Sequence, residues 1–353
     1  MTTPAPAHRR LICLEEHVLD AGVARASGPA MTAAAPFMAD WGSRVTDGID
    51  IADATRPHVV SREASSRLLL DTGASRLEDM DRAGIDMQVL SVGGSPQHIP
   101  DAKEAVDLIR RANDSLAGTV RDHPDRFAAF ATLPWQDPAA AAEELTRCVQ
   151  QLGMVGTLLN GRPGQAFLDD PRYREVLATL AELGVPIYLH PGVPVAEVHD
   201  AYYAGFDPEV SARFGMFGWG WHHEAGIGVV RLILSGAFDR YPGLQVISGH
   251  WGEMVPFYLQ RLDDSIPREA SGLSRTITQT YRDQVLVTPS GMLTEPQFTF
   301  CLNVLGADRM LFSVDYPYQS LDGVRSFIEG LAVPEAEKDA IAHRNAETLL
   351  HLG

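Results

Sequence analysis

The sequence contains few cysteines and no block of basic residues, and each absence excludes a class of function. Its three cysteines, Cys13, Cys148 and Cys301, are far apart within apolar patterns, which favours reduced core thiols over a disulfide framework or a thiolate site. The 29 Lys and Arg against 46 Asp and Glu give a formal net charge of −17. Phosphate binding needs clustered cations, so we expect no nucleic-acid partner. An anionic substrate must be held locally, by a metal or an Arg.

Long hydrophobic runs are also missing. No stretch approaches the ~20 apolar residues of a membrane span, and Glu15 and Glu16 interrupt the first apolar stretch after the N-terminus, where a signal peptide would need a continuous core. We therefore expect a soluble, cytoplasmic protein with no membrane partner. Phosphate-loop, Rossmann and Gly-x-Ser-x-Gly signatures are absent too, and the last absence argues against α/β-hydrolase chemistry.

Short β-rich runs alternate with longer amphipathic segments along the chain. The runs are almost continuously apolar, which is typical of parallel strands covered on both faces by helices. Eight such units predict an α/β fold, a distorted (β/α)8 TIM barrel. We expect strands at 11–17, 86–92, 127–134, 155–160, 185–190, 244–250, 284–290 and 310–315, and helices at 101–122, 138–152, 171–183, 254–264, 321–331 and 334–349.

The pattern predicts one catalytic domain, residues 11–353, behind a flexible N-terminal tail, residues 1–10. Residues 18–75 and 192–228 lack a clear period and predict long irregular insertions after strands 1 and 5. Long loops on the catalytic face of a barrel commonly shape a substrate pocket. The second stretch is rich in aromatic residues, which favours an apolar or aromatic ligand, although packing against the barrel rim would explain the same composition.

Four predicted strands end on residues that can bind a metal or move a proton. They are LICLEEH, VPIYLHP, LQVISGHWGE and MLFSVDYP, which end near His17, His190, His250 and Asp315. The carboxyl ends of barrel strands meet on one face, so we expect these side chains to converge. Glu15 lies two residues before His17 and shares its face of the strand. A carboxylate with an imidazole suits Zn²⁺ or Mn²⁺.

Each ending also has a simpler explanation when it is taken alone. Glu15 and His17 could form an exposed strand end, and His190 could be a structural histidine. Glu253, three residues after His250, could set the tautomer of that imidazole or favour the N-terminus of a helix. Asp315 could bind a metal, transfer a proton or cap the following segment.

Other polar residues carry weaker signals. Asn160 ends the fourth predicted strand and could hydrogen-bond a substrate or begin the turn NGRPG. His222 and His223 lie in the aromatic stretch, where a histidine pair is more often solvated than catalytic.

Taken together, LEEH, IYLHP, the run from Arg231 to Asp263, LVTPSG and ADRMLFSVDYPYQS resemble the decarboxylase branch of the amidohydrolase superfamily. That branch includes γ-resorcylate, 2,3-dihydroxybenzoate, 5-carboxyvanillate and aminocarboxymuconate semialdehyde decarboxylases, and the similarity spans about residues 11 to 350. Glu-x-His in place of the His-x-His of hydrolytic members resembles the resorcylate type. The resemblance implies that one divalent metal, Zn²⁺ or Mn²⁺, is bound by Glu15, His17, His190 and Asp315.

The same resemblance implies further roles. His250 and Glu253 would be catalytic residues beside the metal. Asp315 would be both a metal ligand and a catalytic residue. The relatives use an Arg near residues 265–278, for which Arg268 and Arg275 are the candidates. Asn160, His222 and Tyr316 complete the expected substrate contacts, and a homodimer or homotetramer is the expected assembly.

These residues lead to the hypothesis of a non-oxidative carboxy-lyase acting on a small hydroxylated aromatic, or related unsaturated, carboxylate. Asp315 would protonate the carboxyl-bearing carbon before CO₂ leaves. The alternative is a metal-dependent amidohydrolase or lactonase, in which Asp315 is the base for a metal-bound hydroxide. A barrel that has lost catalysis and serves as a binding or assembly protein is a third possibility.

Overall fold

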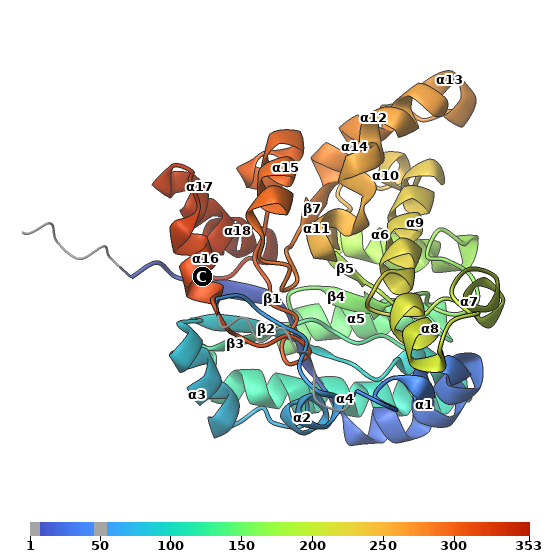
Figure 1. Cartoon of the computed structure of the whole chain (residues 1–353). Helices are drawn as coiled ribbons and strands as arrows, with labels where there is room; N and C mark the ends of the chain where they lie inside the picture. Colours follow the sequence, from blue (N-terminus) through green and yellow to red (C-terminus); the bar gives the residue numbers. More distant parts are fainter. Residues whose placement is uncertain (1–7, 46–54) are drawn as a thin grey trace, which may run out of the picture.

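Parallel strands form the centre of the molecule and helices surround them (Figure 1). The computed structural model describes residues 8–45 and 55–353. In this part of the chain three strands pair in one sheet and four in a second, always parallel and in chain order. The strands are β1 (Ile12–Val18), β2 (Met87–Val92), β3 (Phe127–Ala129), β4 (Thr157–Asn160), β5 (Ile187–His190), β6 (Val246–Ser248) and β7 (Val285–Val287).

Backbone contacts join the two sheets into a closed ring. Residues 310–316 take the place of an eighth strand between β7 and β1, although they do not form a regular strand. The α/β barrel predicted from the sequence is therefore confirmed, with one irregular member. The closing hydrogen bonds run from Ala131 N to Gly156 O (2.8 Å), from Leu311 N to Val287 O (2.8 Å), from Leu14 N to Phe312 O (3.0 Å) and from His17 N to Tyr316 O (2.7 Å).

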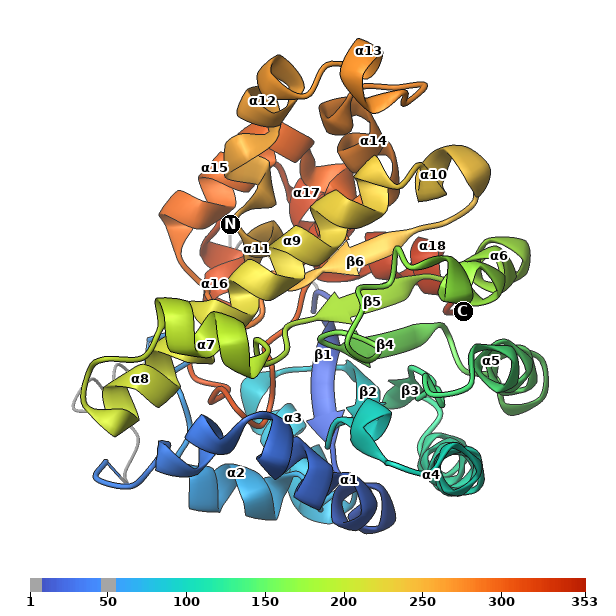
Figure 2. The ribbon, with the colours of Figure 1, turned by 90° about the vertical axis from the view of Figure 1, so that its right-hand side faces the viewer.

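Helices follow most of the strands, and α4, α5 and α6 lie on the outside of the strands (Figure 2). The Asp137 side chain caps α5 and Gly153, at φ 72°, ends it, as the sequence predicts. The helices after the second to fifth strands are η2 (Pro96–His98), α4 (Ala102–Asp122), α5 (Pro138–Leu152), η3 (Pro171–Tyr173), α6 (Arg174–Leu183), α7 (Ala196–Tyr202), α8 (Pro208–Gly215), α9 (Gly220–Leu234) and α10 (Ala237–Arg240).

The C-terminal third consists mainly of helices, which lie before and after β7 and the irregular eighth position, residues 310–316. Its elements are α11 (Gly249–Glu253), α12 (Val255–Ser265), α13 (Arg268–Ser271), α14 (Ile277–Gln284), α15 (Glu295–Leu305), η4 (Ala307–Arg309), α16 (Val324–Gly330), α17 (Glu335–Asp339), the π-helical turn η5 (Ala340–Arg344) and α18 (Asn345–Leu350). The single helix expected at 334–349 is thus divided into three parts. None of the helices in the described ranges is both long and apolar enough to be a membrane span.

The two stretches expected to be irregular contain helices, so that expectation is wrong. Between β1 and β2 lie α1 (Ala21–Ala34), η1 (Pro36–Asp40), α2 (Arg62–Leu68) and α3 (Ala74–Ala83), while residues 46–54 lie outside the described part of the chain. Between β5 and β6, α7, α8 and α9 fill most of the segment. Sequence periodicity failed here because α1 and α9 are apolar on much of their circumference, so no single stripe stands out.

The start of the described chain is tied to the C-terminal helices. Arg9 forms ion pairs with Glu329, Glu335 and Asp339, and Arg10 pairs with Glu347 at 2.7 Å. Of the tail expected at residues 1–10, residues 1–7 lie outside the described residues.

Apart from a β-bulge in β1, every second strand residue points into a packed barrel interior, which becomes polar toward the carboxyl ends of the strands. The apolar part includes Ile12, Leu14, Val89, Leu158, Ile247, Leu286 and Leu311, and Ala346 and Leu350 of α18 pack against it. Above it, Tyr188, Thr288, Ser290 and Ser313 form a buried layer of hydroxyl groups. The site is built on this polar layer.

The turns after β4 and β5 touch through their backbones. A Cβ atom on Gly192 would lie 2.3 Å from Gly161 Cα, and one on Gly161 would lie 2.8 Å from Gly192 Cα. Only glycine allows this approach, which sets the positions of Asn160 and His190 at the ends of the two strands.

We expect Gly192→Ala to lower the free energy of unfolding by about 1–3 kcal/mol, because the added methyl group has no space. Urea unfolding would measure the change. Gly118→Ala on α4 is the matched control, since its Cβ would approach no atom closer than 3.7 Å, and we expect it to be neutral or slightly stabilising. Equal stability of the two variants would contradict the proposed steric role.

Candidate metal centre and active site

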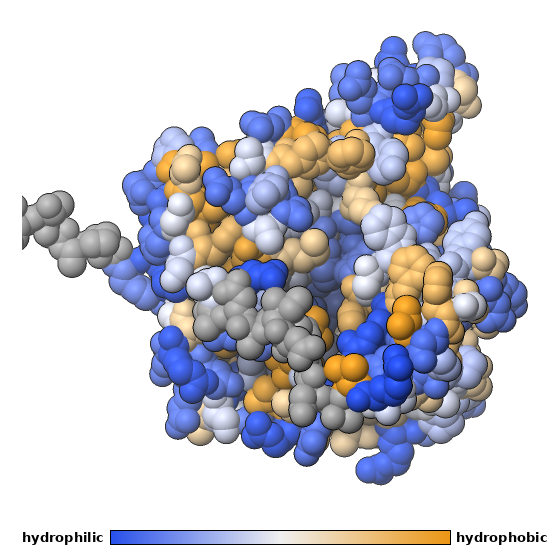
Figure 3. All heavy atoms as spheres, viewed as in Figure 1, coloured by the Kyte–Doolittle hydropathy of each residue, from blue (hydrophilic) through white to orange (hydrophobic). Residues whose placement is uncertain are grey.

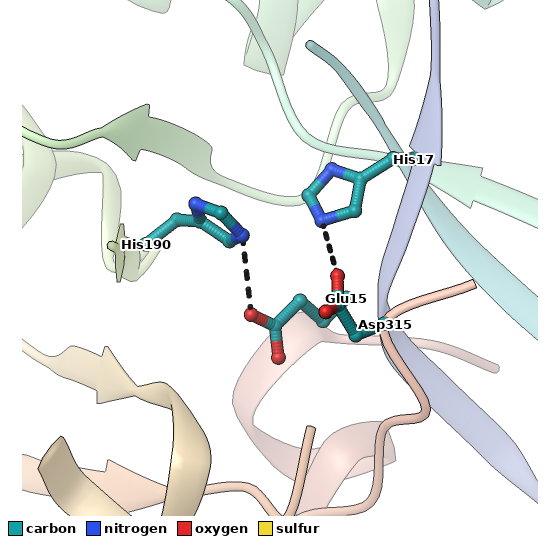
Figure 4. A group of neighbouring side chains, drawn as sticks. All are labelled: Glu15, His17, His190 and Asp315. Atoms are coloured by element: carbon teal, nitrogen blue, oxygen red, sulfur yellow. Dashed lines mark ion pairs between the residues drawn. The ribbon is translucent and has the colours of Figure 1, made fainter. Parts of the chain in front are cut away.

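Four side chains converge at the carboxyl ends of the strands: Glu15 and His17 from β1, His190 from the end of β5, and Asp315 from the eighth position (Figure 4). Each offers one ligand atom, and the four atoms all lie within 4.8 Å of one another. His17 Nε2 is 3.1 Å from Asp315 Oδ1, and His190 Nε2 is 3.5 Å from Glu15 Oε1. The structure therefore brings together the four residues that the sequence nominated as metal ligands.

The unpaired nitrogen and oxygen atoms of this cluster fit a divalent cation. Glu15 Oε1, His17 Nε2 and Asp315 Oδ1 are buried, and none of these atoms has a hydrogen-bond partner. Buried polar atoms are rarely left unpaired in proteins. Two carboxylates and two imidazoles form a ligand set suited to Mn²⁺ or Zn²⁺. A cation between the four atoms would satisfy all of them.

The second nitrogen of each histidine is held by the protein. His190 Nδ1 lies 2.7 Å from Pro191 O. A carbonyl oxygen only accepts, so Nδ1 carries the proton and the Nε2 lone pair faces the cluster. His17 Nδ1 is hydrogen-bonded to Ser91 Oγ at 3.1 Å. Burial, together with the neighbouring His17 and His250, holds the pKa of His190 well below its usual value, which favours the neutral form that binds metals.

Glu15 is the most constrained member of the cluster. Its Oε2 accepts from Tyr188 Oη at 2.5 Å, from Ser290 Oγ and from Ser313 Oγ at 3.3 Å, which leaves Oε1 free for the cluster. Burial raises the pKa of Glu15 to about 7. A cation at Oε1 would favour the ionised form and lower this pKa.

A β-bulge decides which carboxylate of β1 faces the site. The register of β1 against β2 shifts between Cys13 and Glu16. Ile12 and Leu14 point into the barrel, so a regular strand would direct Glu16 inward as well; the bulge turns Glu15 inward instead. Glu16 faces the other side, where its Oε1 accepts from Val314 N at 3.0 Å. The expected separation of the two carboxylates is observed, but its cause was not foreseen.

A left-handed turn after β6 presents a second cluster. Residues 250–254 all have positive φ, from 46° to 81°. Within this turn His250 Nδ1 lies 2.8 Å from Glu253 Oε1, and His222 Nδ1 lies 2.9 Å from Glu253 Oε2. Such backbone costs about 1–2 kcal/mol for each non-glycine residue and is typically retained at functional sites. The turn brings the side chains of His250 and Glu253 together on the same side of the backbone.

The charges within this second cluster support one another. Burial opposes ionisation of His250, but the Glu253 and Glu15 carboxylates outweigh it and raise the pKa of His250 to about 9. Burial likewise opposes ionisation of Glu253, yet His250 and His222 lower its pKa below the usual range. A buried ion pair of His250 and Glu253 therefore lies beside the four-residue cluster.

A cavity of about 520 Å³ opens onto the cluster, and His17, His190 and Asp315 line it. Its other walls come from α1, η1 and η2, from the turn after β4 and from the segment between β5 and α9. The face of the molecule seen in Figure 3 is hollowed near its centre, and both apolar and polar side chains surround the hollow. The volume lies within the ~300–1,000 Å³ typical of small-molecule sites.

The remaining candidates take different positions. Asn160 lines the cavity. His222 and His223 lie on α9 and not in a loop, which corrects the prediction, and His222 contacts Glu253. Tyr316 turns away from the cavity, because its hydroxyl donates to Asp79 at 2.7 Å and Arg76 covers its ring.

Arg268 and Arg275 do not line the cavity. Arg268 belongs to α13, which projects with α12 and α14 beyond the barrel (Figures 1 and 2). Arg275 pairs with Asp283 at 2.8 Å and with Gln284. Within a single chain the structure gives neither of them a substrate contact.

Tyr318 and Arg162 are among the lining residues that sequence reasoning missed. Tyr318 lies three residues after Asp315, its ring is 5.4 Å from that of His17, and it lines the cavity. The short spacing from Asp315 in SVDYPYQ was a usable signal. Arg162 also lines the cavity and pairs with Glu224 at 2.6 Å, a contact between the turn after β4 and α9 that no local pattern reveals.

Comparison with known proteins shows where this arrangement belongs. The model of a family described as amidohydrolase matches residues 60–352. The chain belongs to the amidohydrolase family. A gamma-resorcylate decarboxylase of Rhodococcus jostii is 36% identical over 302 residues, and the match covers 80% of this chain and 89% of that protein.

Solved structures give the same placement. A dihydroxybenzoic acid decarboxylase from Polaromonas sp., with bound manganese and the inhibitor 2-nitroresorcinol, has a TM-score of 0.80 and 30% identity over 98% of this chain and 97% of that one. A 5-carboxyvanillate decarboxylase from Novosphingobium aromaticivorans, complexed with manganese and 4-hydroxy-3-methoxy-5-nitrobenzoic acid, has a TM-score of 0.84 and 30% identity over 99% and 98%. The predicted resemblance to the decarboxylase branch is confirmed.

We expect the purified protein to bind one divalent ion per chain and to lose thermal stability when a chelator removes it. A ligand that binds only the folded state stabilises it by about 2.7 kcal/mol at a hundredfold excess over Kd. His190→Ala should abolish tight binding, measured by elemental analysis and calorimetry. His223→Ala, a histidine of α9 that is not part of either cluster, should keep it. Full metal content in His190→Ala would contradict the assignment.

The metal-free protein should lose stability as the pH rises from about 6.5 to about 9. The pKa of His250 rises from 6.5 to about 9 on folding, so the folded state holds a proton that the unfolded chain releases. The contribution is complete below 6.5 and is lost through this range. Urea unfolding across the range would measure the slope, and Glu253→Gln should flatten it. An unchanged slope in that variant would assign the effect to another group.

Proposed function

We propose that this protein is a metal-dependent, non-oxidative decarboxylase of hydroxylated aromatic carboxylic acids. The observation that carries the proposal is the convergence of Glu15, His17, His190 and Asp315, with three unpaired buried atoms, at the end of a cavity sized for a small molecule. Family membership and the likeness to decarboxylases over most of the chain support this chemistry over hydrolysis.

We assign the four ligands to one Mn²⁺, with Zn²⁺ as the alternative. Their mixed carboxylate and imidazole donors suit both ions, and two structural relatives hold manganese. When bound, the ion supplies positive charge that orients the substrate oxygens and offsets their negative charge.

Asp315 is the proposed proton donor. It lines the cavity at its metal end, and its φ of 68° directs the carboxyl group there. Its proton goes to the ring carbon that bears the carboxylate, which interrupts the aromatic system. The bond from that carbon to the carboxylate then breaks, its electron pair restores the ring, and CO₂ leaves. The Asp315 carboxylate regains a proton from water, so each turnover consumes one proton.

His250 and Glu253 are the proposed polarising pair. Glu253 holds His250 protonated through Nδ1, which leaves the opposite ring nitrogen to donate to a phenolic oxygen. His222 holds the second oxygen of Glu253 and so fixes the orientation of the pair. A preorganised cation of this kind stabilises negative charge as it develops on the ring oxygen.

The walls of the cavity position the substrate and exclude water. We treat the segments between β1 and β2 and between β5 and β6 as insertions into the barrel that build these walls. Asn160 and Tyr318 are the proposed polar contacts. We retain the proposals of a single catalytic domain, residues 11–353, and of a homodimer or homotetramer. The substrate-binding roles of Arg268 and Arg275 stay predictions, because neither residue lines the cavity of this chain.

Asp315→Asn should lower kcat by about 10²–10⁴-fold on an accepted hydroxybenzoate, because an amide cannot donate the proton. Release of CO₂ and loss of substrate absorbance would be followed with excess metal present, and metal content would be measured in parallel. Asp308→Asn makes the same exchange at an exposed position and should leave kcat unchanged.

Full turnover by a metal-loaded Asp315→Asn variant would show that the proton comes from elsewhere. Hydrolysis of lactones or amides, with every hydroxybenzoate left intact, would replace the decarboxylase by the hydrolase alternative.

A further inference from the structure

The cavity is larger than a single hydroxylated ring requires. Its volume of about 520 Å³ lies well inside the ~300–1,000 Å³ range of pockets that bury drug-sized ligands. A dihydroxybenzoate is one ring with three small substituents, and the metal cluster would hold one end of it. Much of the space would remain unfilled, which a site that excludes water does not favour.

An aromatic wall leads away from the metal cluster. The ring of His190 lies 6.5 Å from Trp221, Trp221 lies 5.9 Å from Phe217, and Phe217 lies 5.3 Å from Trp41. All four residues line the cavity. This aromatic wall runs without a break from the candidate metal ligand His190 to Trp41, the residue after η1. An apolar group attached to the bound ring would therefore have contacts along the length of the wall.

Helix α1 lines the cavity mostly with small residues. Ala24, Ser27, Gly28 and Met31 follow helical spacing on one face and line the cavity together. A Cβ on Gly28 would have no atom within 4 Å. The Ser27 hydroxyl is taken by the carbonyl oxygens of Val23 (2.9 Å) and Gly94 (2.5 Å). This face therefore offers open space without a free hydrogen-bonding group.

The lining does not favour a second charged substituent. Arg162 is the single Arg or Lys among the described residues that line the cavity. Its guanidinium is paired with Glu224, through Nε at 2.8 Å and Nη2 at 2.6 Å. Among the described residues that line the cavity, no unpaired Arg or Lys is left to neutralise an additional carboxylate beyond the metal cluster.

We infer that the preferred substrate is a hydroxylated aromatic acid that carries an extended apolar substituent, an alkyl chain or a second ring, lying between helix α1 and the wall of Trp41, Phe217 and Trp221. The inference rests on the proposed function and specifies its substrate class. The substituent displaces water from the space that a simple dihydroxybenzoate leaves open.

A series of 2-hydroxybenzoates with hydrogen, methyl or pentyl at ring carbon 4, 5 or 6, one position per compound, tests the inference with the metal-loaded enzyme. At one position or more, kcat/KM should rise by about fourfold for each buried methylene group. An unsubstituted acid that is used as well as every alkyl compound would overturn the inference while leaving the decarboxylase proposal intact.

Gly28→Leu places a side chain in the open space and should reduce the preference for pentyl over hydrogen by at least about tenfold. Gly118→Leu introduces the same side chain on α4, outside the cavity, and should keep the preference. Equal effects of Gly28→Leu on all acids would overturn the assignment of the α1 face to the apolar substituent.

Calorimetry with resorcinol and 5-pentylresorcinol, the product-like ligands, keeps the test independent of turnover. Tighter binding of the pentyl compound, lost in Gly28→Leu, supports the inference. Equal affinities contradict it. If no acid loses CO₂ while this difference in binding persists, the proposed reaction fails but the apolar site stands.

Discussion

The burial of the Glu15 carboxylate is the constraint on which the rest of the site depends. Tyr188, Ser290 and Ser313 donate to one of its oxygens, while the other is left without a partner. Removing a carboxylate from water is costly unless its charge is compensated. The polar layer of the barrel orients the group, and a cation shared with His17, His190 and Asp315 would compensate it. The metal centre thus follows from the electrostatics of the barrel interior.

The same end of the barrel concentrates unusual backbone. Residues 250–254, Ser290 and Asp315 all adopt positive φ, and they follow three successive strand positions. The strained turns are held by hydrogen bonds from His250 N to Ser290 Oγ (2.9 Å) and from Trp251 N to Thr288 O (2.8 Å). The stability of the packed barrel compensates for this strain. The strained turns direct His250, Glu253 and Asp315 toward the candidate metal centre. Rigid placement of this kind is what proton transfer and charge stabilisation require.

Two segments far apart in the sequence complete the site. Phe37 of η1 stacks on His199 of α7, with ring centroids 3.7 Å apart, and Glu209 of α8 accepts from the backbone nitrogens of Arg44 (2.8 Å) and Val45 (3.1 Å). The segment after β1 is thereby joined to the segment after β5 above the metal ligands. Barrel strands supply the reactive groups, and these joined segments supply the shape of the cavity and its apolar character.

The sequence by itself determined the barrel and the identity of its reactive strand ends. Buried strands leave near-continuous apolar runs, so the residue that ends each run stands out, as at His17, His190 and Asp315. The caps of α5 were readable for the same reason, because they are local. Tertiary structure alone decided the rest. Residues distant in the chain determine the β-bulge in β1, the pairing of Arg162 with Glu224, the position of His222 beside Glu253 and the open space at Gly28. Their contacts arise only when the ring closes, and no local period encodes them.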